Sequence, residues 1–413
     1  MPLQLLKYGL GLARPSARVL PATPPLQTGY DVVIIGAGGH GLAAAHYLAR
    51  DHGLRRVAVL DKGYLGGGNT ARNTAIIRAN YLTPEGVRFY ATSMALFREM
   101  SQELGLNVMV SRRGHLTLAH SDASLRTMRW RAEVNKHLGV DSEVIGPDDI
   151  ARLCPALDLS RDARWPVLGA LYHPEGATAR HDAVAWGYAR SAASHGVEIH
   201  QQTEVTGLTL RGNRVTTVHT SRGAVTCDRV LVAVAGASSQ VGRMAGLRLP
   251  IRTIPLQACV STPLKPFLDP IIVSGSLHTY IWQSQRGELV MGGAADPYPL
   301  YDTRATLAWK EGLMTHLVEL LPCLRDIHIM RQWAGMTDMT PDFAPIMGPT
   351  PVDNLYLDAG WGTWGFKATP AAGKSMAQCV AEGRVPDIIA PFRLDRFDSF
   401  RQLGEAGAAA VGH

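Results

Sequence analysis

The sequence lacks an apolar run long enough to cross a bilayer, which takes about 20 residues, and we therefore expect no membrane span. It also has little cysteine: five residues in 413, an odd number, with no two at the spacing of a metal site. We expect these cysteines to be reduced thiols in a cytoplasmic protein, with neither a zinc nor an iron–sulfur site. The five are Cys154, Cys227, Cys259, Cys323 and Cys379.

A tract of like charge is missing as well. Lys and Arg number 41 against 35 acidic residues, a net charge of +6, and they are scattered along the chain. A nucleic-acid-binding protein would cluster its basic residues or interleave them with aromatic ones, so we expect no nucleic-acid partner. The mild positive balance suits an anionic cofactor and an anionic substrate equally well. With 46% hydrophobic and 18% charged residues, the chain is typical of a globular protein with two domains.

The first 28 residues differ from the rest of the chain. They hold five prolines, several basic residues and no acidic residue. Targeting peptides have a similar composition, but neither a clean apolar core nor a small-residue cleavage site follows. We favour the alternative of an arm, residues 1–28, that lies extended on the domain or on a partner subunit.

Residues 31–61 predict a strand, a glycine turn, a helix and a second strand in succession. Residues 31–35 and 56–61 are short apolar runs, and residues 42–50 are rich in alanine. Strands joined in this way by a helix pair in parallel. Further along we expect helices over 85–104, 124–138, 182–195 and 307–321, and strands over 114–120, 197–200, 230–235 and 354–358.

The glycine turn has the spacing of a dinucleotide-binding loop. Gly36 would permit the tight turn, Gly38 would let the backbone approach a pyrophosphate, and Gly41 would let the helix pack closely on the strand. The helix start adds free N–H groups and a positive dipole end. At the end of the second strand, Asp61 suits the hydroxyls of a ribose. The glycines alone are a weak signal, but in this βαβ setting they predict a dinucleotide cofactor.

A second glycine-rich loop distinguishes between NAD and FAD. Residues 66–73 read GGGNTARN and come shortly after Asp61. We interpret this loop as a binding site for the ribityl chain and pyrophosphate of a flavin, because NAD dehydrogenases do not usually need a second glycine-rich loop at this position. The alternative is a flexible surface loop. The sequence therefore favours FAD.

The middle of the chain predicts a second domain. From residue 251 to 294 the pattern alternates and is rich in turns, as in an antiparallel sheet. We predict an α/β fold: a Rossmann-like FAD-binding domain with an inserted α+β substrate domain built on an antiparallel sheet. The FAD-binding domain would be discontinuous, over 29–110, 166–248 and 335–413, and the substrate domain would take up 111–165 and 249–334.

A further glycine turn lies near the end of the chain. The strand over 354–358 runs into residues 360–367 and then into a helix that we expect to begin near Pro370. The N–H groups of a helix start stabilise negative charge, which a reduced flavin carries on its pyrimidine end. Lys367 would add to this effect. The alternative, a solvated lysine on a first turn, is disfavoured by the helix dipole.

Three other side chains are candidates by their context. Arg78 follows an apolar run and would suit a bidentate clamp on a substrate carboxylate, although a structural salt bridge is an equal alternative. His173 and His181 belong to the stretch 172–182, and composition does not decide whether either one is functional.

Five segments of the chain resemble a known family, the β subunits of heterotetrameric sarcosine oxidases, within the D-amino-acid-oxidase-like flavoproteins. The resemblance covers nearly the whole chain beyond residue 28, and its second and third segments are more specific than the glycine loop. The segments are YDVVIIGAGGHGLAAAHYLA, GGGNTARNTAIIRANYL, ARHDAVAWGYARSA, GWGTWGFKATP and EAGAAAVGH.

The resemblance implies a set of site residues. Arg78 and Lys367 would be the catalytic pair that holds the substrate carboxylate over the flavin. His181, with Arg180 beside it, would match the histidine that carries a covalently linked FMN in this family, at the interface with a larger α subunit. FAD would be bound noncovalently by Gly36, Ala37, Gly38, Gly39, His40, Gly41, Asp61, Lys62, Asn69, Thr70, Arg72, Asn73, Val205, Gly236, Gly362 and Gly365.

The resemblance also implies a reaction. A small secondary amino acid such as sarcosine would give a hydride to FAD, and the electrons would pass through FMN to oxygen, giving hydrogen peroxide. The imine, or its formaldehyde equivalent, would travel to folate on the α subunit of a complex that also contains small subunits. One alternative is a single-flavin dehydrogenase of proline or an N-methyl amino acid that uses another electron acceptor. Another is a non-catalytic, flavin-stabilised assembly subunit.

Some residues depart from the family pattern. Trp364 stands where the family usually has glycine, and a large group beside the flavin would narrow or reshape the substrate pocket. Asp61 replaces the commoner glutamate, and the stretch over 335–348 matches only approximately. We therefore keep another N-methyl or cyclic amino acid open as the substrate.

Overall fold

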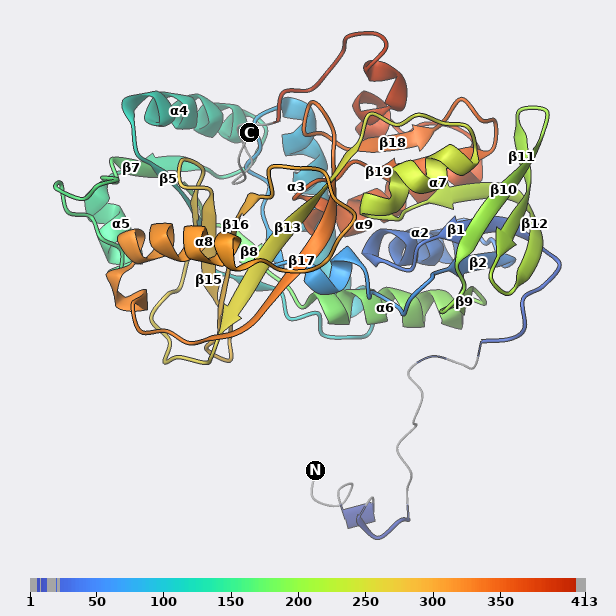
Figure 1. Cartoon of the computed structure of the whole chain (residues 1–413), viewed down its shortest axis with the longest axis horizontal. Helices are drawn as coiled ribbons and strands as arrows, with labels where there is room; N and C mark the ends of the chain where they lie inside the picture. The colour runs from blue at the N-terminus through green and yellow to red at the C-terminus, as the bar shows by residue number, and fades with distance from the viewer. Residues whose placement is uncertain (1–5, 8, 13–19, 21–22, 406–413) are drawn as a thin grey trace.

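The computed structural model describes residues 6–7, 9–12, 20 and 23–405. In this part of the chain, two eight-stranded sheets lie at opposite ends of an elongated molecule, and a three-stranded sheet lies between them (Figure 1). The predicted N-terminal arm falls largely outside the described residues. Within it, the Thr23 hydroxyl donates a hydrogen bond to the carbonyl of Ile199 at 2.8 Å.

The first sheet contains the predicted βαβ unit. Its described strands are β1 (Gly29–Ile35), β2 (Val57–Leu60), β9 (Glu198–His200), β10 (Val205–Arg211), β11 (Arg214–Thr220), β12 (Gly223–Val232), β18 (Ile346–Pro349) and β19 (Leu355–Ala359). They follow the order β10-β11-β12-β1-β2-β9, with β19 beside β12 and β18 beside β19. β1 pairs in parallel with β2 and β12, which confirms the parallel arrangement.

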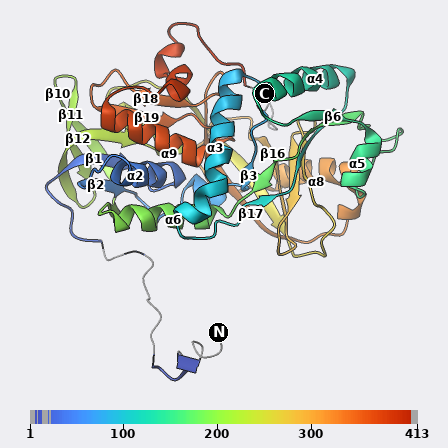
Figure 2. The same ribbon diagram turned by 180° about the vertical axis from the view of Figure 1, so that it is seen from behind.

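Helices cover both faces of this sheet. On one face lie α2 (Gly39–Arg50), α6 (His181–Ser194) and α9 (Gly365–Glu382), and on the other lies α7 (Ser238–Met244). α3 (Pro84–Glu103) packs against α9. Figure 2 shows α2 between α6 and α9. α2 buries all of its residues except His40 and Arg50, because it is apolar all round and has a neighbour on each side. The α2 start is thereby fixed against the start of α9.

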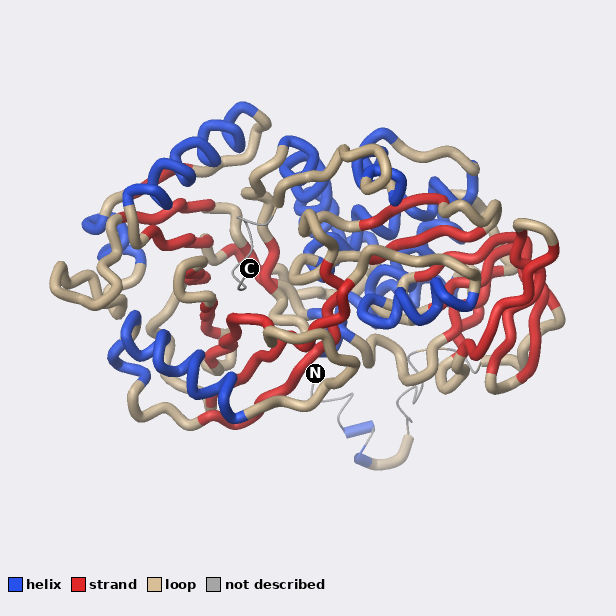
Figure 3. The backbone as a smooth tube through the Cα atoms, turned by 45° about the horizontal axis from the view of Figure 1, so that its top comes forward, coloured by secondary structure: helices blue, strands red, loops and turns tan. Residues whose placement is uncertain are grey.

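The second sheet has the order β17-β13-β16-β15-β14-β5-β7-β6. Its described strands are β5 (His115–Ala119), β6 (Glu143–Ile145), β7 (Gly169–His173), β13 (Arg252–Ser261), β14 (Ile271–Ser274), β15 (Thr279–Gln283), β16 (Leu289–Ala295) and β17 (Ile329–Met339). The pairs from β13 to β16 are antiparallel, which confirms the prediction for 251–294. Figure 3 shows α4 (Asp122–His137) and α8 (Leu307–Leu320) on opposite sides of this sheet.

Short elements complete the chain between the sheets. The small sheet is β3 (Ile76–Ile77), β8 (Ala177–Thr178) and β4 (Ser111–Arg112). The remaining helices of the described chain are α5 (Pro147–Leu153), η1 (Asn69–Arg72), η2 (Ala235–Ala237), η3 (Pro322–Leu324), η4 (Asp387–Phe392) and η5 (Leu394–Arg396).

Two expected boundaries are wrong. α9 begins at Gly365 and not near Pro370, because a proline at this position removes only one helical hydrogen bond and the helix continues through it. The strand expected over 230–235 ends at Val232, since Ala235 has a φ of +46° and turns the chain into η2. The division into domains stays a prediction, although β7 pairs with β5 and so joins the second sheet, beyond the boundary expected at 166.

The described residues contain no group of three or more His, Cys, Asp and Glu side chains that could hold a metal ion. Among the helices described, none combines the length and apolar character that crossing a membrane requires. All five cysteines are free, and four of them are buried.

Candidate active site

A cavity of about 670 Å³ lies where the carboxyl ends of the first sheet face the second sheet. Ile35, Leu60 and Ala233 line it from the ends of β1, β2 and β12. In open α/β sheets this edge is where ligands bind. From the second sheet the lining residues are His115, Leu256, Gln257, Ala258, Val273, Tyr280, Gly335, Met336, Thr337 and Asp338.

The glycine turn after β1 shapes one end of the cavity. Gly36 has a φ of +111°, and a Cβ atom there would lie 2.3 Å from the carbonyl oxygen of Ala233. A Cβ on Gly41 would lie 2.0 Å from the carbonyl oxygen of Gly36. Gly38 caps α2 without a side-chain hydrogen bond, and the first turn has no acidic residue. The helix start therefore presents backbone N–H groups and positive potential to the cavity.

Asp61 lies at the end of β2, as predicted, and joins two loops. One carboxylate oxygen accepts a hydrogen bond from the Ala37 amide at 2.7 Å, and the other accepts one from the Gly63 amide at 2.8 Å. Asp61 and Lys62 also line the cavity. Because a carboxylate can accept about four hydrogen bonds, Asp61 retains acceptor capacity for a ligand hydroxyl.

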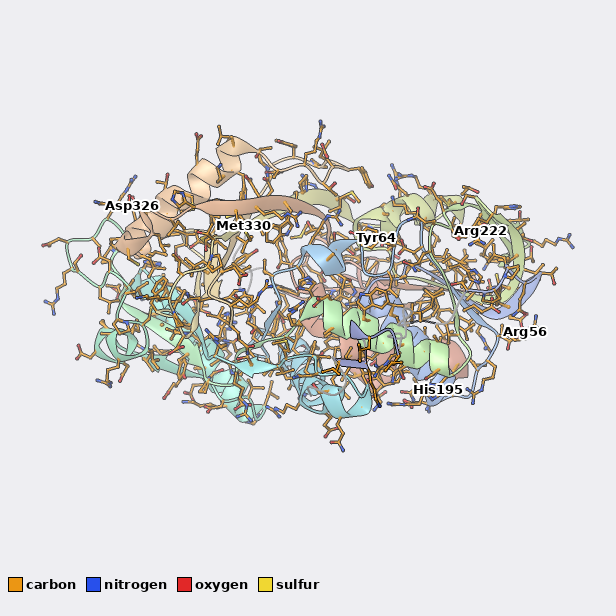
Figure 4. The ribbon with its side chains drawn as sticks, turned by 90° about the horizontal axis from the view of Figure 1, so that it is seen from below. Arg56, Tyr64, His195, Arg222, Asp326 and Met330 are labelled. Atoms are coloured by element: carbon orange, nitrogen blue, oxygen red, sulfur yellow. The ribbon has the colours of Figure 1, made fainter. Side chains whose placement is uncertain are left out.

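Hydrogen bonds hold the second glycine-rich loop in place. The Thr70 hydroxyl accepts a hydrogen bond from the Gly39 amide at 2.9 Å. The Asn69 side chain donates to the carbonyl of Met336 at 2.6 Å and accepts from its amide at 3.1 Å. The loop thus connects the start of α2 to β17, which disfavours the alternative of a flexible surface loop. Tyr64, labelled in Figure 4, also lines the cavity and is 59% exposed.

A largely buried cluster of charged side chains connects the two helix starts. His40 contacts Asp358 through Nδ1 at 3.0 Å and the carbonyl oxygen of Gly365 through Nε2 at 2.7 Å. Both partners are acceptors, so the imidazole satisfies both only when it is doubly protonated. Burial alone would lower the pKa of His40, but Asp358 and the Gly365 carbonyl outweigh it and hold the pKa above its ordinary value. Trp361 donates its indole N–H to Asp358 at 2.5 Å.

Asp338 extends this cluster to β17. Its carboxylate accepts a hydrogen bond from the Gly360 amide at 2.6 Å. Burial raises the pKa of Asp338 to about 6, against the backbone hydrogen bonds that lower it. The sequence patterns singled out neither Asp338 nor the pairing of His40 with Asp358.

The start of α9 lies beside the start of α2 and also lines the cavity. Trp364 caps the helix without a side-chain hydrogen bond, the first turn has no acidic residue, and residues 361–367 line the cavity. Lys367 is 7% exposed, and burial together with Arg78 holds its pKa well below the ordinary range. Two buried basic side chains thus lie where a helix start already favours an anion.

Arg78 lies just beyond β3 and is 6% exposed. Its guanidinium group donates to the carbonyl of Asn80 at 2.9 Å and lies over the Tyr81 ring, 4.4 Å from the centroid. Trp364 meets the same Tyr81 ring edge-on at 5.2 Å. The structure therefore brings both predicted catalytic residues and Trp364 to one cavity.

Four predicted residues lie outside this lining. Ala37 and Gly41 belong to the glycine turn, where they serve its geometry. Arg180 forms an ion pair with Asp182, and His181 begins α6. The His181 ring meets Phe366 edge-on with centroids 6.4 Å apart, and Phe366 does line the cavity. The remaining predicted FAD-binding residues line the cavity: Gly36, Gly38, Gly39, His40, Asp61, Lys62, Asn69, Thr70, Arg72, Asn73, Val205, Gly236, Gly362 and Gly365.

The fold, the two uncapped helix starts and the paired glycine loops define a flavin-dependent oxidoreductase. The model of the family "FAD dependent oxidoreductase" matches residues 31–379. Curated relatives are the sarcosine oxidase subunit beta of an Arthrobacter species, 45% identical over 95% of this chain and 97% of that protein, and that of Rhizobium meliloti, 47% identical over 92% and 91%. The chain therefore belongs to the FAD-dependent oxidoreductase family that includes the β subunits of sarcosine oxidase, and it is an FAD-dependent amino-acid oxidoreductase.

Solved structures are similar to this fold as well. An L-proline dehydrogenase from P. horikoshii superposes with a TM-score of 0.85 at 26% identity, covering 92% of this chain and all of that one. A glycine oxidase from Geobacillus kaustophilus superposes with a TM-score of 0.81 at 22% identity, covering 90% of this chain and 99% of that one.

Proposed function

We propose that this protein is the catalytic β subunit of a cytoplasmic, multi-subunit sarcosine oxidase. In this proposal a small secondary amino acid is oxidised by hydride transfer to FAD, and the electrons then pass through FMN to oxygen, giving hydrogen peroxide. The observation that carries the proposal is the pair of buried cations, Arg78 and Lys367, that line one cavity beside the uncapped start of α9. The names of the relatives support the assembly with further subunits.

The residues of the cavity fit FAD. The start of α2 offers N–H groups to a pyrophosphate, and a side chain at Gly36 or Gly41 would clash with backbone. Asp61 has spare acceptor capacity for ribose hydroxyls, and the pinned 69–73 loop borders the space between the two helix starts. Bound FAD would supply the hydride acceptor, with its pyrimidine end stabilised near the start of α9.

Side chains of the protein would orient the substrate. Arg78 and Lys367 would bind the carboxylate, which fixes the carbon next to the amine relative to the cofactor. Both cations are largely shielded from water, so their attraction for a carboxylate is stronger than at the surface. Closure of the cavity would also protect an imine product from premature hydrolysis.

FMN is proposed at His181. The imidazole is half-buried at the start of α6, and burial lowers its pKa, so that the ring is neutral and has a nitrogen lone pair for a covalent bond. Arg180, which is exposed, could pair with a phosphate. The His181 ring meets the ring of Phe366, which lines the cavity, and this contact would keep the two cofactors close.

The activity is tested with protein purified together with the subunits that accompany it. We expect sarcosine and oxygen to yield hydrogen peroxide and formaldehyde in equal amounts. Acid precipitation should leave yellow flavin in the pellet, and His181→Ala should release all flavin to the supernatant. Peroxide formation without any pellet-bound flavin would contradict the FMN assignment while leaving the FAD chemistry intact.

A second candidate is a single-flavin dehydrogenase of proline or an N-methyl amino acid. The similarity to an L-proline dehydrogenase supports it, with a TM-score of 0.85. In that case the flavin would appear entirely in the supernatant, and proline would reduce the enzyme faster than sarcosine, with an acceptor dye in place of oxygen.

A further inference from the structure

His115 is a buried histidine that lines the cavity. It begins β5, is 1% exposed, and belongs to the residues that line the cavity from the second sheet. Its Nδ1 atom is fully buried and has no hydrogen-bond partner in the described part of the chain. A buried polar atom without a partner costs about 1–3 kcal/mol, so its retention calls for an explanation.

The neighbouring His173 provides a contrast. It pairs with His115 across β5 and β7 and is also buried. Its Nδ1 donates to the carbonyl of Asp141 at 2.6 Å, and its Nε2 accepts from the Ala79 amide at 3.4 Å. Both ring nitrogens of His173 thus have hydrogen-bond partners in the protein, and His173 lies outside the cavity lining. The His115 ring, in contrast, retains hydrogen-bonding capacity for a ligand.

The surroundings of His115 keep its ring uncharged. Burial, followed by Arg78, His173, Arg131 and Lys367, holds the pKa of His115 well below its usual range. Arg78, Arg131 and Lys367 approach from after β3, from α4 and from α9, and His173 approaches from β7. Glu405 is the acid near Arg131, and its carboxylate already accepts from the amides of residues 82 and 83. At neutral pH the His115 ring therefore has an acceptor nitrogen and no charge.

We propose that His115 accepts a hydrogen bond from the substrate's amine and so selects the uncharged secondary amine. This inference rests on the proposed function, with Arg78 and Lys367 holding the carboxylate. The cations around the cavity repel an ammonium group, while a neutral imidazole accepts the N–H of a free amine. No proton transfer to His115 is needed, because the ammonium proton is lost to water before the amine binds.

The selection matters for the chemistry of oxidation. A hydride can leave the carbon next to nitrogen only when the nitrogen lone pair is free to form the C=N bond, and an ammonium group has none. Binding the free amine therefore places the reactive form of the substrate in the cavity. An acceptor opposite the amine also fixes its rotation about the bond to the carboxylate-bearing carbon.

The test compares His115→Leu and His115→Asn with wild-type holoenzyme. The probes are sarcosine and methoxyacetate, which has the same carboxylate but an ether oxygen in place of the N–H. We expect His115→Leu to raise KM for sarcosine about tenfold, the value of one hydrogen bond, with kcat changed less. Its Kd for methoxyacetate, read from the flavin absorbance, should stay within about twofold of wild type. His115→Asn, whose amide oxygen can accept the bond, should recover part of the loss.

His120→Gln serves as the matched control, because His120 follows the same strand but bonds to Ser274 outside the cavity lining. It should leave both values unchanged. Equal losses for sarcosine and methoxyacetate in both His115 variants would overturn the inference, since they would indicate a purely structural role. So would an unchanged KM in His115→Leu while wild type is reduced normally. A wild-type flavin that no small secondary amine reduces would overturn the proposed function, and this inference with it.

Discussion

His40 and Asp358 form a largely buried ion pair at 3.0 Å that joins the start of α2 to the end of β19. The two residues are 318 positions apart in the chain. The pair holds the dinucleotide loop against the start of α9, because His40 also contacts the Gly365 carbonyl. The two helix starts that would face the cofactor thus have one electrostatic connection between them.

Asp358→Asn should destabilise the protein most at low pH. The pKa of His40 is raised in the folded state, so the stability from the pair is fully present below about pH 6.5. It is lost as the pH rises through the raised pKa, when His40 becomes neutral. We expect a cost of about 3–5 kcal/mol near pH 6 that shrinks toward pH 9, measured by thermal unfolding of both proteins across this range. If the loss of stability in Asp358→Asn did not depend on pH, His40 would not be charged in the folded protein.

Gly41→Ala should abolish FAD binding while leaving much of the chain folded. A Cβ there would lie 2.0 Å from the Gly36 carbonyl oxygen, so the turn must open and its N–H groups must move. Gly312→Ala is the control, because that glycine lies in α8 with nothing within 4 Å of its Cβ position. The measurement is the flavin content of each purified protein, and normal FAD content in Gly41→Ala would exclude this role for the turn.

Lys367→Met should weaken carboxylate binding about 10- to 100-fold, the loss of a charged hydrogen bond. In wild type, the affinity for methoxyacetate should fall as the pH rises through the lowered pKa of Lys367, because the neutral amine no longer attracts the anion. That pH dependence should disappear in the variant. Lys374→Met, on the exposed side of the same helix, should change neither property.

Trp364→Ala should widen the substrate range. The indole is 3% exposed, lines the cavity and meets Tyr81 edge-on. Its removal should raise kcat/KM for N-ethylglycine and proline relative to sarcosine, at a stability cost of about 3–5 kcal/mol. Trp130→Ala, at a position 71% exposed on α4, should leave the ratio unchanged, and an unchanged ratio in Trp364→Ala would mean that the indole does not limit the substrate.

The sequence predicted best what is local. The strand, glycine turn and helix over 31–50 were readable because the apolar run, the turn glycines and the alanine content all lie within a few residues. The pattern of the 251–294 segment likewise identified its antiparallel sheet. The start of α9 was placed too late because proline is a weak guide to a helix start, which depends here on the turn made by residues 360–364.

The rest of the site depends on contacts distant in the chain. The pairing of His40 with Asp358 depends on how α2 lies against the end of β19. The approach of His115 to Lys367 follows from how the two sheets meet. A single histidine in an alternating strand carries no sign of whether its ring will face a cavity or the core. Arg78 and Lys367 were singled out by their local context, an apolar run and an expected helix start, and by the family resemblance, and their roles remain predictions.

The most direct test of the account is anaerobic titration of the purified holoenzyme with sarcosine. The account predicts that the visible flavin band bleaches with substrate, that wild type is reduced far faster than Lys367→Met, and that oxygen restores the band. A flavin that dithionite reduces but that neither sarcosine, proline nor any other small secondary amine bleaches would contradict it.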